Sequence, residues 1–108
     1  MLSLKVQNRQ RVEREICTKL IETAIGAGYT ISVDNGEEIV IKRSIVLADI
    51  LAVMFSVDEE TLKLHKDDCT SSVFLTYGEC GYDVIADHNS TLESLLEPVL
   101  KFAETFQL

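Results

Sequence analysis

Long apolar runs are absent from this chain of 108 residues. No stretch approaches the ~20 consecutive apolar residues with which a helix spans a bilayer. The opening segment turns polar after six residues, and it has neither the apolar centre nor the small-residue cleavage site of a secretory signal. These absences predict a cytoplasmic protein without a membrane segment.

Proline and cysteine are scarce as well. The chain has one proline and no linker, repeat or low-complexity segment, so we expect a single domain over residues 1–108. Its three cysteines, Cys17, Cys69 and Cys80, form an odd set without the spacing of a zinc site. In the absence of a secretory signal, a disulfide framework is not expected. The sequence therefore indicates neither a metal nor another cofactor.

Glycine-rich loops of the kind that bind phosphate are missing too. Gly26 and Gly28 follow a helical pattern and do not connect a strand to a helix start, so they indicate a helix end. Gly78 and Gly81 bound the turn of a predicted hairpin. Because no motif of an enzyme class occurs, the sequence favours a non-enzymatic protein.

Basic residues are few and unevenly placed. The chain has 10 Lys and Arg residues against 18 Asp and Glu residues, with a formal net charge of −8. Residues 1–19 hold five basic and two acidic groups, whereas residues 20–108 hold five basic and sixteen acidic groups. A body this acidic repels a phosphate backbone, so we expect no direct binding to nucleic acid. The acidic excess either serves solubility or forms a surface for a basic partner.

The residue patterns that are present predict helices alternating with pairs of strands. Helical patterns cover residues 8–27, 45–55 and 90–106, and strand patterns cover residues 29–33, 38–43, 61–65, 73–77 and 82–86. The resulting order is α-β-β-α-β-β-β-α. An antiparallel sheet with helices packed on one face is the economical packing for this order, so we predict an α+β fold.

Capping residues set the expected boundaries of the helices. Asn8 and Ser44 are the predicted N-caps of the first two helices, and Gly28 is the predicted left-handed residue after the first. A capping box is expected over a short acidic turn at residues 56–59, and another at residues 90–93 opens the last helix. Pro98 should kink or divide the last helix, because it removes one backbone donor.

The apolar pattern also predicts how the strands of the two hairpins pair. In the first hairpin a two-residue Asn-Gly turn competes with a loop of three or five residues. The odd-length loop is favoured, because it gathers the apolar residues on one face by pairing Val33 with Ile39 and Ile31 with Ile41. In the second hairpin the expected pairs are Tyr77 with Tyr82, Leu75 with Val84 and Val73 with Ala86.

The enzymatic alternative is a small thiol-dependent or hydrolytic enzyme that uses Cys69 and His88. Cys69, together with His65 or His88 and nearby aspartates, contains the minimum set for a thiol nucleophile at the open end of the second hairpin. The same polar residues are also ordinary starts and ends of strands. A four-ligand zinc site that adds Cys80 is not expected, because Cys80 lies at the hairpin turn, roughly 16 Å or more from the other end.

Three stretches resemble a known set of proteins: VQNRQRVEREIC, AVMFSVDEE and VFLTYGECGYDVIADHNSTLE. They are similar to small, acidic, uncharacterised proteins of bacterial prophages, plasmids and integrative elements. The hairpin pattern Tyr-Gly-x-x-Gly-Tyr-Asp-Val-Ile is the most distinctive part, and the resemblance spans most of the chain. It implies an accessory protein of a mobile genetic element, a class that often binds host machinery, and it assigns no activity or functional residues.

These observations predict a non-enzymatic binding or regulatory protein that acts on a host protein partner. The contact would use the acidic surface or the basic first helix, and a basic nucleic-acid-binding protein is one class of partner that fits. A homodimer formed through the sheet face or edge is a further alternative. The predicted partner-binding residues are Arg9, Arg11, Arg14, Asp58, Glu59, Glu60, Asp67, Asp68, Glu79, Asp83 and Asp87.

Overall fold

The computed structural model describes residues 4–78 and 84–106. Within them, the helices are α1 (Leu4–Gly26), α2 (Leu47–Val53) and α3 (Glu93–Glu104), the last preceded by a short 3-10 turn, η2 (Ser90–Leu92). The strands are β1 (Thr30–Asp34), β2 (Ile39–Ser44), β3 (Glu59–Lys66), β4 (Cys69–Thr76) and β5 (Ile85–His88). They form one antiparallel sheet in the order β2-β1-β3-β4-β5. The predicted fold class and element order are confirmed.

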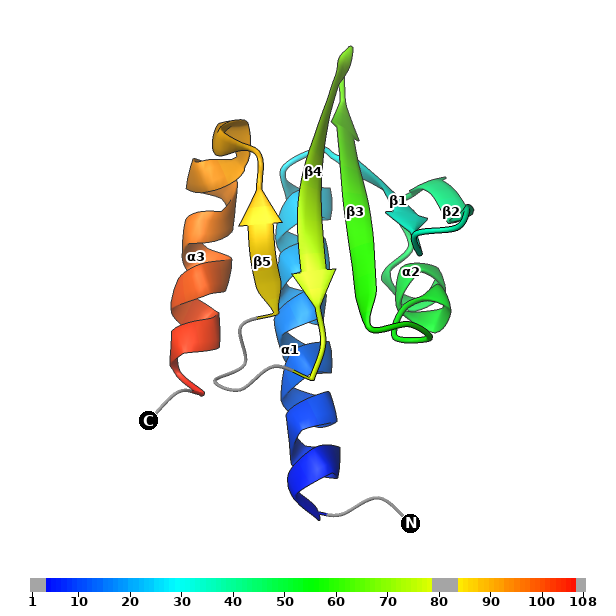
Figure 1. Cartoon of the computed structure of the whole chain (residues 1–108). Coiled ribbons are helices and arrows are strands. Elements are labelled where there is room, and N and C mark those ends of the chain that lie inside the picture. Colours follow the sequence, from blue (N-terminus) through cyan, green and yellow to red (C-terminus); the bar gives the residue numbers. More distant parts are fainter. Residues whose placement is uncertain (1–3, 79–83, 107–108) are drawn as a thin grey trace.

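The core lies between the sheet and α1. In Figure 1, α1 runs behind the sheet, α3 stands beside β5, and α2 lies at the β1–β2 side. An apolar stripe of α1 is buried, from Val12 through Ile16 to Leu20. In β3 the side chains alternate, with Leu62 and Leu64 buried against the helices and their neighbours on the other face. The helices therefore cover one face of the sheet, as expected.

Helix α1 ends as predicted but starts earlier. Gly28 adopts φ +96°, and its N–H and that of the next residue donate to the carbonyls of Ile25 and Ala24. This is the Schellman pattern that a left-handed glycine allows. The helix already includes Asn8, which is therefore not its N-cap. The Asn8 side-chain oxygen instead accepts a hydrogen bond from Arg11 at 2.9 Å.

The predicted register of the first hairpin is wrong. Asp34 pairs with Ile39 across a four-residue loop, and Val33 pairs with Ile41 only after a β-bulge. Side-chain oxygens of Asp34 and Asn35 accept hydrogen bonds from the three backbone N–H groups that follow, at 2.8–2.9 Å. These local bonds fix the loop. The bulge then gives one apolar pair, Val33 with Ile41, whereas Ile31 pairs with Ser44.

The predicted register of the second hairpin is wrong as well. Val73 pairs with His88, and Leu75 pairs with Ile85, so β5 lies farther along the chain than expected. A β-bulge next to Leu75 shifts the pairing, and alternation of apolar residues does not reveal such an extra residue. The turn of this hairpin, with Tyr82 as the expected partner of Tyr77, lies outside the described residues.

Three expectations about helix ends are also wrong. Helix α2 is shorter than expected, and Ser44 ends β2, where its Oγ accepts the Val46 N–H at 3.1 Å. Residues 54–58 form bends where a short acidic turn was expected, and β3 begins at Glu59, two residues earlier than predicted. The box at residues 90–93 forms η2 without a side-chain cap. Helix α3 continues through Pro98 and is not divided there.

Candidate functional site

The sheet face opposite the helices is not covered by any described element (Figure 1). Strand pairing places four side chains in a row across this face: Asp34 pairs with Thr61, Thr61 with Phe74, and Phe74 with Asp87. Their strand neighbours Val33, Leu62 and Val73 are buried on the helix side, so alternation puts the row outside. A half-buried aromatic ring thus lies between two carboxylates on an open surface.

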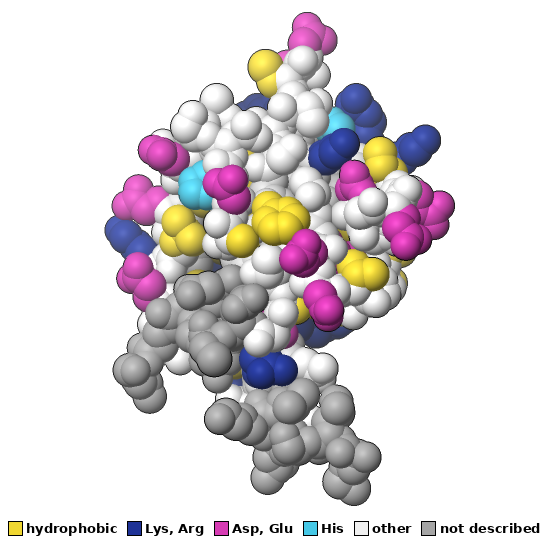
Figure 2. Space-filling view, viewed as in Figure 1, with side chains coloured by type: hydrophobic (Ala, Val, Ile, Leu, Met, Phe, Trp, Pro, Cys, Tyr) yellow, Lys and Arg dark blue, Asp and Glu magenta, His cyan; other side chains and the backbone are white. Residues whose placement is uncertain are grey.

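Shallow hollows lie on both sides of Phe74. One, of about 340 Å³, is lined by Phe74 together with Asp34, Asp58 and Glu59. The other, of about 260 Å³, is lined by Phe74 and Asp87 with neighbouring polar residues. Figure 2 shows hydrophobic side chains near the middle of this view with acidic side chains around them. We call these five residues, Asp34, Asp58, Glu59, Phe74 and Asp87, the acidic face.

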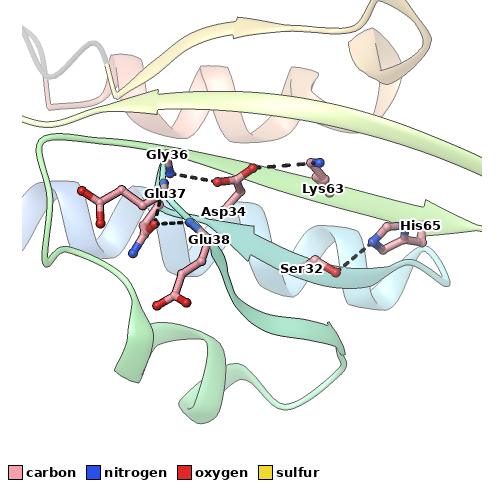
Figure 3. A network of polar contacts seen from close by, with 8 residues as sticks. Ser32, Asp34, Gly36, Glu37, Glu38, Lys63 and His65 are labelled. Carbon is pink, nitrogen blue, oxygen red and sulfur yellow. Dashed lines mark hydrogen bonds and ion pairs between the residues drawn. The ribbon is translucent and has the colours of Figure 1, made fainter.

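A smaller basic group lies on the same side of the sheet, toward the β3–β4 turn. Lys63 lies on β3 two residues after Thr61 and on the same face of the sheet. Its Nζ lies 4.0 Å from the nearer Asp34 oxygen (Figure 3). Arg43, at the end of β2, adopts φ +47° beside a β-bulge. Burial and the charges of Arg43 and Lys63 lower the pKa of His65 below its ordinary value. Along β3 the open surface changes from the acidic face to these two cations, Lys63 and Arg43, which we call the basic end, and the turn beyond them carries Asp67 and Asp68.

A hydrogen-bonded chain holds the basic end in place. Ser32 is buried, and its Oγ accepts the Arg43 N–H at 3.0 Å and bonds His65 Nε2 at 2.9 Å (Figure 3). His65 Nδ1 lies 3.0 Å from Thr70 Oγ1. In a neutral imidazole one ring nitrogen donates and the other accepts, so the two hydroxyls take opposite roles toward the ring, and the tautomer decides which of them donates. This chain joins β2, β1, β3 and β4.

The structure places only some of the predicted carboxylates together. Asp58, Glu59 and Asp87 belong to the acidic face. Asp67 and Asp68 are exposed at the turn between β3 and β4, at the far end of the hairpin. Two other predicted residues, Glu79 and Asp83, lie outside the described residues. Asp34 and Phe74 were missed by the sequence analysis, because only the observed registers bring them into the row.

Glu60 does not belong to a surface. Its side chain is 1% exposed, and its Oε1 accepts hydrogen bonds from the Tyr77 hydroxyl at 2.8 Å and the Phe55 N–H at 2.9 Å. The other carboxylate oxygen is buried without a partner among the described residues. Because β3 alternates, Glu60 points to the helix side with Leu62, while Glu59 points outward. Glu60 therefore acts inside the fold, and its predicted place on a binding surface is corrected.

The three predicted arginines do not form one basic surface. Arg11 pairs with Glu15 at 2.9 Å one turn along α1. Arg9 and Arg14 line a cavity whose wall also includes Glu13 and the acidic-face residue Asp58. Positive and negative groups are thus interspersed along α1, which removes the expected separation between a basic helix and an acidic body.

A buried polar cluster lies beneath that cavity. Tyr77 packs its ring against Phe55, with ring centroids 5.0 Å apart, and its hydroxyl contacts both Glu60 and the Cys17 thiol. Burial, with the neighbouring Cys17 and Glu60, raises the pKa of Tyr77. Burial likewise raises the pKa of the Cys17 thiol. Both groups are therefore neutral at physiological pH, so their role is structural rather than nucleophilic.

The residues of the thiol alternative are not brought together. His88 pairs with Val73, and Cys69 lies four residues earlier on β4, which separates the two by roughly 13 Å along the strand. His65 lies nearer, but its ring nitrogens bond Ser32 and Thr70. Among the described residues, no group of three His, Cys, Asp or Glu side chains is arranged to hold a metal ion.

No protein-family model matches the chain, and no curated protein or solved structure matches it either. In the described part of the chain, every helix is too short or too polar to cross a membrane. The assignment of a function therefore rests on the geometry of the acidic face and of the cavity beside α1.

Proposed function

We propose that this protein is a non-enzymatic binding protein whose acidic face binds a lysine- or arginine-rich segment of a partner protein. The observation that carries the proposal is the row across the open sheet, in which Phe74 lies between Asp34 and Asp87. An apolar side chain of the partner would contact the Phe74 ring, and flanking cations would contact the carboxylates.

The anatomy of the acidic face supports this function. Protein interfaces commonly combine an aromatic anchor with a polar rim that excludes water around it. Phe74 provides such an anchor, and the hollows on its two sides give room for neighbouring side chains of a partner. Its rim carries four carboxylates, of which only Asp34 has a cation nearby among the described residues, at 4.0 Å.

Charge determines which partner fits. A basic segment gains attraction from Asp58, Glu59 and Asp87, and long-range attraction from the chain's net charge of −8. The basic end, with Lys63 and Arg43, would repel the same cations and so fix the direction in which the segment binds. The resemblance to proteins of mobile elements suggests that the partner belongs to the host, and a nucleic-acid-binding protein has the required charge.

The test uses a synthetic peptide with lysines on both sides of one central leucine, titrated into the protein by calorimetry. Asp34→Asn/Asp87→Asn should weaken binding about threefold to tenfold, as expected for two exposed charge pairs. Both asparagines keep the side-chain oxygens that accept the N–H groups of Gly36 and His88. Phe74→Ala should weaken binding at least about fivefold.

The matched control is Glu93→Gln/Glu104→Gln on α3, which makes the same change in net charge away from the acidic face. It should leave the affinity within about twofold of the wild type. Raising the salt from about 0.1 M to about 1 M, which shortens the Debye length from about 10 Å to about 3 Å, should abolish most of the binding. Equal losses in the two double variants, or binding indifferent to salt, would reject the proposal.

A homodimer is a second candidate, and one observation favours it. Strand β2 is an edge of the sheet, and exposed apolar residues lie on it and just after it: Ile39 is 39% exposed, Ile45 62% and Val46 49%. An exposed apolar edge is a common pairing site. If two copies pair there, light scattering gives a dimer mass that Ile45→Lys converts to the monomer mass; a monomer mass for the wild type excludes this candidate.

A further inference from the structure

A cavity of about 430 Å³ lies beside the first half of α1 and adjoins the acidic face, with which it shares Asp58. It falls within the range of volumes typical of small-molecule sites, about 300–1,000 Å³. Its walls come from three separate segments: α1, the stretch after α2 that contains Phe55, and Tyr77 and Gly78 directly after β4. Val57 and Asp58 line both this cavity and one hollow of the acidic face.

Two arginines line this cavity and have no anionic partner among the described residues. No hydrogen bond or ion pair joins the Arg9 side chain to another described residue, and its Nε is buried and unbonded. The Arg14 guanidinium lies over the Phe55 ring, 5.8 Å from the centroid, and pairs with no described carboxylate. Arg11, by contrast, is ion-paired with Glu15 outside the cavity. Each guanidinium has five donors, so the cavity offers a concentration of unused donors.

The carboxylates near the cavity do not form ion pairs with these two arginines among the described residues. Glu13 is 4% exposed, and its Oε2 accepts the backbone N–H of Gly78 at 2.6 Å. Glu60 lies deeper and is bonded to Tyr77 and Phe55. Asp58 is the other carboxylate in the wall, and it forms no ion pair with Arg9 or Arg14 among the described residues. Among the described residues, the cavity therefore has two cations without an ion pair, and Glu13 and Glu60 are used in holding its walls, whereas Asp58 is not.

Shape and chemistry then define the ligand. Guanidinium groups match the planar, two-oxygen geometry of a carboxylate, to which they donate two parallel hydrogen bonds. Phe55 and Tyr77 supply aromatic surface beside them, on which a flat apolar body can pack. We propose that this cavity is a binding site for a small aromatic carboxylate, held by Arg9 and Arg14 and packed against Phe55 and Tyr77.

The test uses sodium benzoate as the probe and benzamide as its neutral counterpart of the same shape, each titrated into the full chain by NMR. Benzoate should shift the ring signals of Phe55 and Tyr77 and the amide of Gly78, and benzamide should shift them much less. Arg9→Gln/Arg14→Gln should weaken benzoate binding at least about tenfold. Arg11→Gln, on the same helix but outside the cavity, should leave it unchanged.

Three results would overturn the proposal. Equal shifts from benzoate and benzamide would show that charge recognition is absent, and this comparison uses only the wild-type protein. Equal losses for Arg11→Gln and the double variant would remove the assignment to Arg9 and Arg14. Inorganic phosphate that displaces benzoate at equal concentration would identify a general anion site in place of one for aromatic carboxylates. None of these probes or variants changes Asp34, Phe74 or Asp87, the residues that the peptide test of the acidic face uses.

Discussion

Removing the Tyr77 hydroxyl should destabilise the protein by about 2 kcal/mol. In the native fold this hydroxyl donates to Glu60 Oε1 at 2.8 Å and contacts the Cys17 thiol. After Tyr77→Phe, the buried Glu60 carboxylate keeps only the Phe55 N–H, at 2.9 Å. A hydrogen bond to a charged group contributes about 1.5–3 kcal/mol, and loss of one partner leaves the other desolvated. The ring packing against Phe55 is unchanged, so the hydroxyl alone is tested.

Urea unfolding measures this loss. With the slope usual for a small domain, the midpoint of Tyr77→Phe should fall by roughly 1–2 M. Tyr29→Phe is the matched control: its ring keeps the contact with Lys66 Nζ, 5.4 Å from the centroid, and the change should cost less than about 0.5 kcal/mol. If both variants lose the same stability, the Glu60–Tyr77 bond does not support the fold. A double cycle with Glu60→Gln should also be non-additive by more than about 0.5 kcal/mol.

Three further predictions concern single positions. Gly26→Ala should raise the free energy of unfolding by about 0.5–1 kcal/mol, because an added Cβ meets nothing within 4 Å in the last turn of α1. Gly28→Ala should lower the free energy of unfolding by about 1 kcal/mol, because φ is +96° at this position. Thermal unfolding of the two variants compares these effects. Because the pKa of His65 is lowered in the fold, the His65 side chain binds a proton more tightly in the unfolded chain than in the folded one. The free energy of unfolding should therefore fall as the pH drops below 6.5. In urea unfolding, His65→Gln should show a smaller fall. Native alkylation with peptide mapping should label exposed Cys69 and spare buried Cys17, and labelling of Cys17 before unfolding would contradict the described core.

The sequence predicted the layers of the fold well, because periodic burial is a property of each segment alone. The helical stripe of Val12, Ile16 and Leu20 and the alternation around Leu62 identified the inward faces without knowledge of their neighbours. The glycine after α1 was also predictable, because a left-handed residue there has few alternatives to glycine.

Strand registers were not predictable, and the candidate site depends on them. The loop after Asp34 is set by side-chain hydrogen bonds to its own backbone, and the pairing of β4 with β5 is shifted by a bulge beside Phe74. Neither changes the apolar pattern on which the expected pairs were based. The row from Asp34 to Asp87 follows from these shifts. Glu60 was misplaced for a related reason. The two residues before it are exposed, and Glu60 points inward only because the alternation of β3 places it on the same face as Leu62.

The most direct test of the proposed function is the contact between the peptide and Phe74. In a complex with the lysine-flanked peptide, intermolecular nuclear Overhauser effects should join the leucine methyl groups to the Phe74 ring. Phe102 on α3, which packs edge-on against Phe106, serves as an internal control on the other layer. Contacts to Phe74 with none to Phe102 are the predicted result, whereas a bound peptide whose leucine contacts only Phe102 or Phe55 would contradict the proposal.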